Sequence, residues 1–356
     1  MIPALLLLLL QDWPTYHGGY GLDGVADAAP ADAPARFWRF KAGGRVDRTP
    51  IVAGGRVFFS TSKGSLHAID LGGAEVWKTD LGKDAFTTPL LHADGFVIGG
   101  TQSGALIAFD AATGKEKWRR DVETPIQGTA NRIDLADGRK GVVIVSQTDG
   151  ALHAFELETG KEAWTTEPIE RCDGSAGVGG GRIVMGSCAS AFHVFSAAKG
   201  DGKQEVALGE DNQVAGGVAV SGAMAFAGTR SGKLCAVDVA EGRLVWTNGE
   251  STKEAFTTPA VNERLVVFGS EGGKIYALKR ETGATVWSFD TGKKPASPAI
   301  AGGRVVVSSG GTLFLLDLES GRKVWSENVS DEITSPAVAG GLVIVGADDG
   351  TVTAYK

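Results

Sequence analysis

The chain holds few residues that could form a recognisable catalytic or metal-binding set. Three of its five histidines, His67, His153 and His193, share one position of a short segment that recurs along the chain. The other copies of the segment mostly carry side chains that cannot do acid–base chemistry near neutral pH: Ile107, Cys235, Tyr276, Phe314 and Thr353. A position that accepts isoleucine and phenylalanine is a packing position. No catalytic or metal-binding histidine is therefore predicted.

One short stretch resembles a calcium-binding loop. Residues 134–138 (DLADG) follow the D-x-D/N-x-D-G pattern with one position deleted, and Gly141 stands where a further carboxylate is expected. Calcium takes roughly six to eight oxygen ligands. Asp134 and Asp137 alone do not supply them, so no metal site is predicted here.

Cys172 and Cys188 are the candidate pair for covalent chemistry. Cys172 opens the first strand of a predicted hairpin, Cys188 ends the second, and Gly179–Gly181 reads as a three-residue turn between them. Antiparallel pairing around that turn places the two cysteines opposite each other, within disulfide reach. A disulfide is predicted, with two unpaired thiols as the alternative. Cys235 occupies the packing position described above and is predicted to be an inert buried thiol.

These residues belong to a chain that repeats with a period of about 41 residues. Seven of the eight tryptophans mark the period: Trp38, Trp77, Trp118, Trp164, Trp246, Trp287 and Trp325. From Trp77 on, each follows a glycine by four residues, so a T-G-x-x-x-W element recurs, and Gly202 with Val206 marks the copy that lacks tryptophan. Because the offset is constant, the tryptophans are predicted to pack between neighbouring repeats rather than to stack on a cofactor.

The elements between these marks are alternating apolar runs bounded by glycine turns, which is typical of strands. Four strands in each repeat predict an all-β fold, an eight-bladed β-propeller of four-stranded antiparallel blades over residues 36–356. The repeats open with a lone tryptophan strand at 36–41, and the last repeat, 333–356, lacks one. The N-terminal strand is therefore predicted to complete the last blade and close the ring.

Residues 1–35 stand outside the repeats. The uncharged run from Ile2 includes six leucines and predicts a truncated or atypical signal peptide over 1–11. It is shorter than the about 20 apolar residues of a membrane span, and no other run approaches that length, so no transmembrane span is predicted. Residues 12–35 are predicted to be a leading segment and linker, with the Asp/Ala/Pro-rich part, 23–34, mobile.

Net charge excludes one class of partner. The chain carries 35 basic and 42 acidic residues, a formal net charge of −7, and no Lys/Arg run longer than two residues. A nucleic-acid surface needs a positive footprint. Nucleic-acid binding is therefore not predicted.

The period, the A-x-D/x-x-T-G-x-x-x-W element and an x-S/T-P-x-V opening strand resemble the PQQ-binding-like (pyrrolo-quinoline quinone) β-propeller repeat family, from about Arg36 to the end. Asp12-Trp13-Pro14 with His17-Gly18 also looks like the start of bacterial secreted members. The family includes quinoprotein dehydrogenases, which bind the quinone and Ca²⁺. It also includes non-catalytic scaffolds, such as the BamB subunit of the outer-membrane β-barrel assembly machinery.

A quinoprotein resemblance implies a Glu/Asn/Asp set for Ca²⁺, an Asp base, basic contacts to the quinone and two adjacent cysteines. The sequence has no Cys-Cys pair. The positions predicted to line the channel offer Arg48 and the carboxylates Asp47 and Asp173, which fall on blades one and four, nearly opposite in an eight-blade ring.

The BamB-like branch is therefore favoured. We expect a secreted, extracytoplasmic (periplasmic) and non-enzymatic scaffold of the bacterial cell envelope, which holds no cofactor and binds other envelope proteins. Two alternatives stay open. One is a dehydrogenase dependent on pyrroloquinoline quinone and Ca²⁺, and the other is an extracytoplasmic ligand-sensing module capped by residues 12–35.

Overall fold

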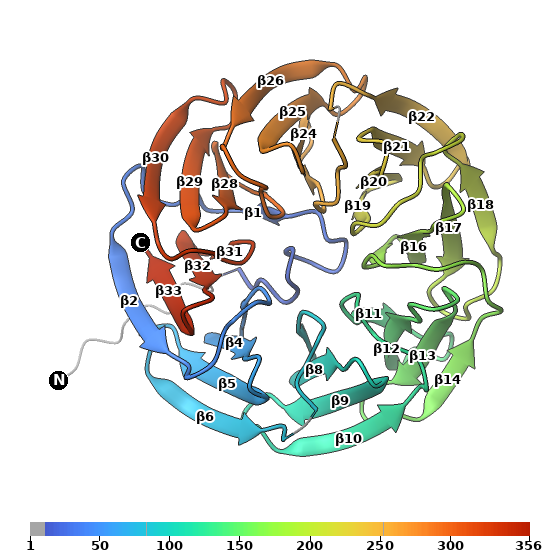
Figure 1. Cartoon of the computed structure of the whole chain (residues 1–356). Helices are drawn as coiled ribbons and strands as arrows, with labels where there is room; N and C mark the ends of the chain where they lie inside the picture. Colours follow the sequence, from blue (N-terminus) through green and yellow to red (C-terminus); the bar gives the residue numbers. More distant parts are fainter. Residues whose placement is uncertain (1–10, 83, 252) are drawn as a thin grey trace.

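Eight β-sheets stand around a central channel like the blades of a propeller (Figure 1). The computed structural model describes residues 11–82, 84–251 and 253–356, so all of the predicted signal peptide except Gln11 lies outside the described residues. The described part of the chain forms strands and connections only, which confirms the predicted all-β, eight-bladed propeller. Over these ranges, no helix is long and apolar enough to cross a membrane.

In each blade the strands run antiparallel from an inner strand at the channel to an outer strand at the rim. The two middle strands are largely buried on both faces because neighbouring blades cover them, whereas the outer strands are mostly exposed or half-buried apart from their inward-facing side chains, such as Trp118 and Trp287. The strands of blades one to four are β3 (Ile51–Ala53), β4 (Arg56–Ser60), β5 (Ser65–Asp70) and β6 (Glu75–Asp80); β7 (Leu91–Ala93), β8 (Phe96–Gly100), β9 (Ala105–Asp110) and β10 (Glu116–Asp121); β11 (Asn131–Asp134), β12 (Lys140–Val145), β13 (Leu152–Glu156) and β14 (Glu162–Thr165); β15 (Gly177–Gly179), β16 (Arg182–Gly186), β17 (Ala191–Ser196) and β18 (Gln204–Ala207).

Blades five to eight follow the same order, except that the first strands of the chain join the last two sheets. Their strands are β19 (Ala219–Ser221), β20 (Met224–Gly228), β21 (Leu234–Asp238) and β22 (Arg243–Asn248); β23 (Ala260–Val261), β24 (Leu265–Ser270), β25 (Lys274–Lys279) and β26 (Thr285–Asp290); β27 (Ala299–Ala301), β28 (Arg304–Ser309), β29 (Thr312–Asp317) and β30 (Lys323–Asn328), with β1 (Val25–Ala26); β31 (Ala337–Ala339), β32 (Leu342–Gly346) and β33 (Thr351–Tyr355), with β2 (Arg36–Lys41).

The N-terminal strand closes the ring, as predicted. Strand β2 pairs antiparallel with β33, and Trp38 lies opposite Ala354. At the end of this pairing, Ala35 and Lys356 exchange two backbone hydrogen bonds of 3.0 and 2.9 Å. Closure leaves no open sheet edge between the first and last blades, which is where an open ring would associate with other chains.

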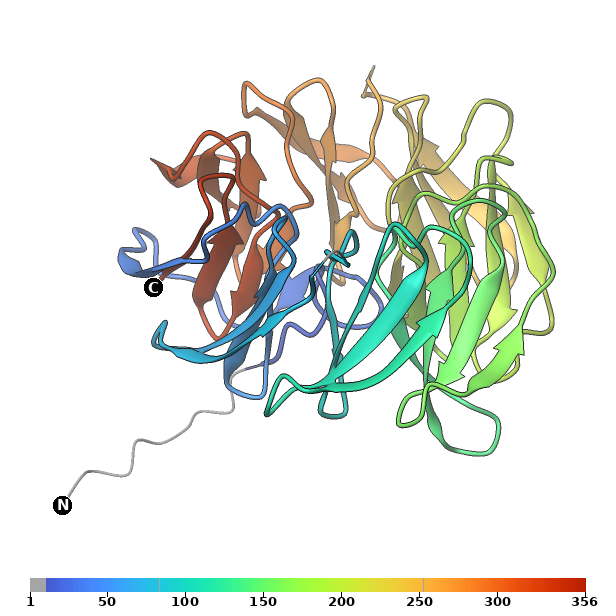
Figure 2. The same ribbon diagram turned by 60° about the horizontal axis from the view of Figure 1, so that its bottom comes forward.

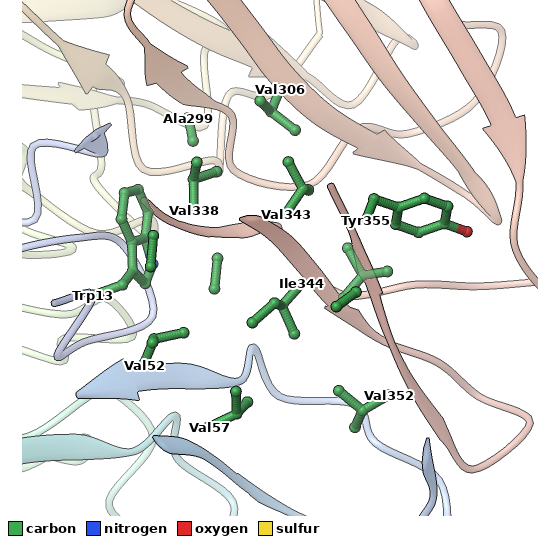
Figure 3. Packing of buried hydrophobic residues seen from close by; sticks show 14 of the residues in the cluster. Trp13, Val52, Val57, Ala299, Val306, Val338, Val343, Ile344, Val352 and Tyr355 are labelled. Carbon is green, nitrogen blue, oxygen red and sulfur yellow. The ribbon is translucent and has the colours of Figure 1, made fainter. Parts of the chain in front are cut away.

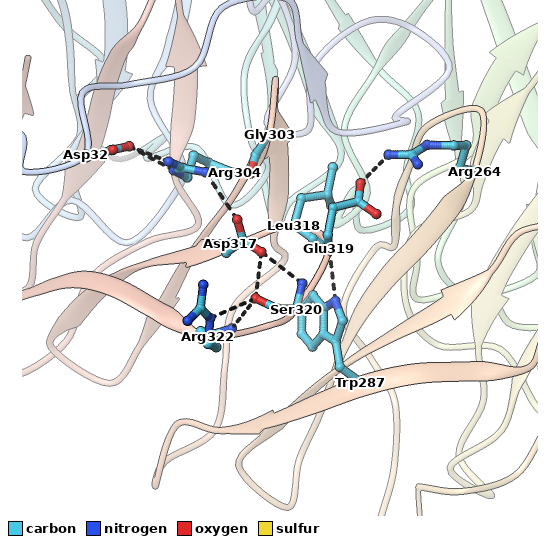
Figure 4. A network of polar contacts seen from close by, with 10 residues as sticks. All are labelled: Asp32, Arg264, Trp287, Gly303, Arg304, Asp317, Leu318, Glu319, Ser320 and Arg322. Carbon is cyan, nitrogen blue, oxygen red and sulfur yellow. Dashed lines mark hydrogen bonds and ion pairs between the residues drawn. The ribbon is translucent and has the colours of Figure 1, made fainter.

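Neighbouring blades are held together by the outer-strand tryptophans. Trp287 of β26 lays its indole against Gly321 of the next blade and donates its Nε1–H to the Leu318 carbonyl at 2.8 Å (Figure 4). The same donation to the next blade recurs from Trp38, Trp77, Trp118 and Trp246. A side chain at the glycine would overlap the indole, which explains the T-G-x-x-x-W element.

Blade four departs from this arrangement. Trp164 packs on Gly200 rather than on Gly202, the glycine that the repeat predicts, because the turn after β17 takes a different course. The Trp164 Nε1 is buried without a hydrogen-bond partner in the described part of the chain.

The contact also differs at the ring closure between blades seven and eight. There, Trp325 packs against the ring of Tyr355 instead of a glycine turn, with 5.6 Å between ring centroids.

Residues 12–29 lie inside the ring, and we call them the channel segment (Figures 1 and 2). They run along the face that carries the turns between inner and second strands, where the Gly54 amide donates to Asp12 Oδ1 at 3.1 Å. Within the part predicted to be mobile, 23–34, β1 pairs in parallel with β27, and the mobility of the rest stays a prediction. Farther along the chain, Asp32 accepts hydrogen bonds from Arg304, which also donates to Asp317 and to the Gly303 carbonyl (Figure 4).

Two glycine substitutions test the tryptophan contact. Gly321 and Gly202 have nearly equal positive φ angles of 67° and 66°. A Cβ at Gly321 would lie 2.5 Å from the Trp287 ring, whereas a Cβ at Gly202 would meet nothing within 4 Å. We expect Gly202→Ala to lower the free energy of unfolding by about 1–2 kcal/mol through backbone strain alone. Gly321→Ala should lose a further ~1–3 kcal/mol through overpacking. Urea denaturation of both variants measures the difference, and equal losses would refute the contact.

Candidate functional site

The floor of the channel is built on Trp13. Its backbone bridges to Val52 of the first inner strand, donating to Val52 O at 2.6 Å and accepting from Val52 N at 2.9 Å. Its indole is fully buried among Val52, Val338 and other inner-strand side chains (Figure 3). Burial of this size anchors the start of the channel segment between the first and last blades.

Tyr16 reaches into a layer of hydroxyl groups across the channel. Seven blades carry a serine or threonine just before the inner strand: Thr49, Thr88, Thr129, Ser175, Thr258, Ser297 and Ser335. The Tyr16 hydroxyl lies 2.5 Å from Thr258 Oγ1. Blade five has Gly217 instead, and a Cβ there would lie 2.3 Å from the Tyr16 hydroxyl. The glycine therefore leaves the room that the tyrosine needs, and burial raises the pKa of Tyr16.

His17 ties the channel segment to blade seven. Its Nδ1 lies 2.8 Å from the Leu22 carbonyl oxygen, and its Nε2 lies 2.8 Å from that of Pro298. Burial lowers the pKa of His17, and the two carbonyl contacts oppose this shift. Gly24 packs against the imidazole, where a Cβ would lie 2.4 Å from the ring.

Backbone carbonyls of the channel segment accept hydrogen bonds from inner strands around the ring. Seven inner-strand and turn amides donate to them, at 2.7–3.3 Å: Val52, His92, Val178, Val220, Val261, Ile300 and Gly302. Blade three contributes a side chain instead, because Asn131 Nδ2 donates to the Tyr20 carbonyl at 2.7 Å. The segment thus contacts successive blades in order and closes this face of the channel.

The opposite opening, which we call the mouth, carries the residues predicted to line the channel. Asp173 accepts hydrogen bonds from Gln147 Nε2 and Arg171 Nε, both at 2.9 Å, and Arg230 Nη2 lies 3.4 Å away. Arg48 donates to the Thr87 carbonyl at 2.7 Å. The structure does not bring the predicted residues together, and Asp173 is already neutralised by arginines.

Two hollows adjoin at the mouth between blades seven, eight and one. The larger, of about 510 Å³, is lined by Lys293, Lys294, Pro295, Ala296, Ser308, Gly310, Glu332 and Ile333. The smaller, of about 90 Å³, shares Glu332 and Ile333 and adds Arg45, Val46, Asp47, Thr334 and Asp348. Asp47 thus lies in a mixed-charge surface hollow, away from Asp173.

The calcium-like loop is organised by ion pairs. Asp134 accepts from Lys140 Nζ at 2.8 Å and from Arg132 Nη2 at 3.0 Å, and Asp137 pairs with Arg139. The hydrogen bond from Lys140 lowers the pKa of Asp134, and the one from Arg139 lowers that of Asp137. Basic side chains therefore hold the carboxylates, and no group of three or more potential metal-ligating side chains occurs among the described residues.

Of the three recurring histidines, His67 and His193 are buried in packed surroundings and His153 is half-buried. His67 stacks on Phe59 with 5.0 Å between ring centroids, and its Nε2 lies 2.9 Å from Ser65 Oγ. His193 is fully buried, and its Nε2 lies 2.8 Å from Ser187 Oγ. Burial lowers the pKa of both imidazoles, and the carboxylates of Glu75 beside His67 and Glu205 beside His193 oppose this shift.

The hairpin that carries the cysteines has a different register from the predicted one. Gly179 pairs with Arg182, so the turn contains only Gly180 and Gly181, both with positive φ. The pairing therefore shifts by one residue, and the Cys188 amide donates to the Arg171 carbonyl at 3.0 Å. Burial, with a smaller effect of nearby Cys188, raises the pKa of Cys172 to about 12. The three cysteines are unpaired in the structure, and the bridge stays a prediction.

Comparison with known proteins decides the family. The sequence matches the family model described as outer membrane protein assembly factor BamB over residues 24–176, 62–213, 193–299 and 271–356. These overlapping matches span the ring. The chain belongs to this family.

Comparisons with individual proteins point to the same family. The protein named outer membrane protein assembly factor BamB in Burkholderia pseudomallei is 26% identical over 303 residues, which are 81% of this chain and 77% of that protein. Among solved structures, BamB from Moraxella catarrhalis aligns with a TM-score of 0.76 and 18% identity, covering 91% of this chain and 98% of that one.

The fold is also shared with an enzyme. Quinohemoprotein alcohol dehydrogenase from Comamonas testosteroni aligns with a TM-score of 0.79 and 15% identity, covering 97% of this chain and 80% of that one. At this identity the likeness shows the fold alone, so function has to be argued from the site.

The feature that sequence reasoning missed is the role of residues 12–29. Asp12-Trp13-Pro14 and His17-Gly18 stood out by resemblance, but nothing assigned Tyr16 to the channel. The contacts run through backbone carbonyls, which every residue has, and therefore leave little trace in side-chain types. The close glycines Gly18, Gly19, Gly21 and Gly24 were the available signal of tight backbone packing.

The redox state of the cysteines is directly measurable. If Cys172 and Cys188 form the bridge in oxidised protein, thiol titration under denaturing conditions should give one free thiol before reduction, from Cys235, and three after it. By closing the chain between Cys172 and Cys188 into a loop, the bridge would raise the free energy of unfolding by up to about 3 kcal/mol. Three free thiols before reduction would exclude the bridge.

Proposed function

We propose that this protein is a non-enzymatic scaffold that acts outside the cytoplasm in the assembly of outer-membrane proteins. The observation that carries the proposal is the family match, which extends over all eight blades and includes relatives named outer membrane protein assembly factor BamB. A ring of this kind offers a rigid surface with exposed turns on both faces, which suits protein partners. Its partners on this proposal are other proteins of the cell envelope.

The residues at the mouth do not fit the quinone and Ca²⁺ that some propellers hold. A Ca²⁺ site needs several convergent oxygen ligands. Asp173 is held by Arg171 and Arg230, whereas Asp47 lies in a separate hollow beside Arg45 and Glu332. No reaction step through such a group is derived, and we propose that the protein works without a cofactor.

A genetic test separates scaffold from enzyme. Deleting the coding gene in the native host should lower the amount of β-barrel proteins in the outer-membrane fraction, as measured by quantitative mass spectrometry. Both the native chain and an Asp47→Asn variant should restore it, since a scaffold does not need that exposed carboxylate. A deletion strain with unchanged β-barrel proteins would contradict the proposal. So would tight, stoichiometric binding of pyrroloquinoline quinone and Ca²⁺ by the purified protein with dye-linked alcohol oxidation.

A further inference from the structure

We propose that the channel floor is a binding site for the main chain of a peptide, and that the chain's own residues 12–29 occupy it as a tethered ligand. The proposal concerns recognition of main chain by the ring and does not depend on which envelope partner the protein serves.

The site consists of hydrogen-bond donors that the blades cannot satisfy among themselves. In each blade the inner strand pairs with its neighbour on one edge only, so its other edge turns toward the channel. The channel floor presents seven such amides, spread over six blades, and the Asn131 side chain of blade three. All of these donors bond to carbonyls of the same segment. A converging set of backbone N–H groups is complementary to the main-chain carbonyls of a bound peptide. Only Val25–Ala26 pairs here as a strand, and the residues before it form turns, in which the Leu22 amide donates to the Gly19 carbonyl and the Gly24 amide to the His17 carbonyl.

The channel segment lies along these donors as a ligand would. Carbonyls of Trp13, Pro14, Tyr20, Gly21, Asp23, Gly24 and Ala26 accept the seven amide hydrogen bonds. Strand β1 joins β27 in parallel, whereas all other pairings between named strands in the described ranges are antiparallel. The segment therefore lies outside the repeat pattern of the eight blades.

Side chains of the segment fill pockets that the ring forms for them. Trp13 is fully buried, and the Tyr16 hydroxyl bonds to Thr258 across the space left by Gly217. His17 bridges to the Pro298 carbonyl of blade seven. These three anchors set the register, and the backbone donors bind the residues between and after them.

The connection from ligand to ring is short and exposed. Residues Ala31, Asp32 and Ala33 are exposed, and beyond them β2 pairs with β33 to close the ring. The tether can therefore be cut without breaking a strand. A site-specific protease sequence inserted after Ala31 gives such a variant, and the uncut protein is its control.

The test is peptide exchange after cleavage. We expect the released fragment to stay on the ring during size-exclusion chromatography. Excess fluorescent peptide with the sequence of residues 11–30 should then replace it, as seen by native mass spectrometry and anisotropy. A peptide with Tyr16→Phe should bind about tenfold more weakly, because it lacks one hydrogen bond. The affinity of a peptide with Trp13→Ala should fall by over ~100-fold.

The unmodified chain provides a second measurement that does not rely on the insertion. Its tethered segment competes at roughly millimolar effective concentration. The labelled peptide should therefore bind it at least ~100-fold more weakly than it binds the cut protein. Equal binding of the peptide and a scrambled control would overturn the proposal. So would a ring that unfolds when the fragment leaves, or a fragment that never exchanges, because the segment would then be an integral part of the fold.

Discussion

Inner strands from around the ring turn one edge each toward the same channel, and each buried amide left unpaired there would cost about 1–3 kcal/mol. A propeller satisfies the other edges by pairing within each blade, and it closes the circle by pairing β2 with β33. The channel edges have no such partner within the repeats. The carbonyls of residues 13–26 supply one, so the non-repeated start of the chain completes the hydrogen bonding of the repeated part.

This arrangement makes the two faces of the ring unequal. One face is closed by a segment fastened with Trp13, Tyr16 and His17, while the mouth remains hollowed between blades seven, eight and one. Charged side chains at the mouth bind one another or lie apart, as Asp173 and Asp47 do. The channel is therefore closed on one face by the chain's own residues and hollowed at the other.

The repeated features could be predicted from the sequence because each motif recurs in many copies along the chain. The tryptophan spacing predicted the blades, and the lone strand at 36–41 predicted the closure. Features that occur once were harder. The hairpin carrying Cys172 differs from the expected register by one residue, because Gly179, Gly180 and Gly181 fit both a two-residue and a three-residue turn. Residues 12–35 were predicted to be a leading segment and linker. The contacts of residues 12–29 with the channel were not predicted, because they are made by main-chain carbonyls and by Tyr16, whose partner, Thr258, lies far along the chain.

Amide hydrogen exchange of the native protein tests the central claim most directly. The amides of Val52, His92, Val178, Val220, Val261, Ile300 and Gly302 should exchange as slowly as the amides of the buried middle strands, since each donates to the channel segment. Exchange of these seven amides at the rate of exposed turn amides, with the middle strands still protected, would show that the segment does not occupy the channel floor.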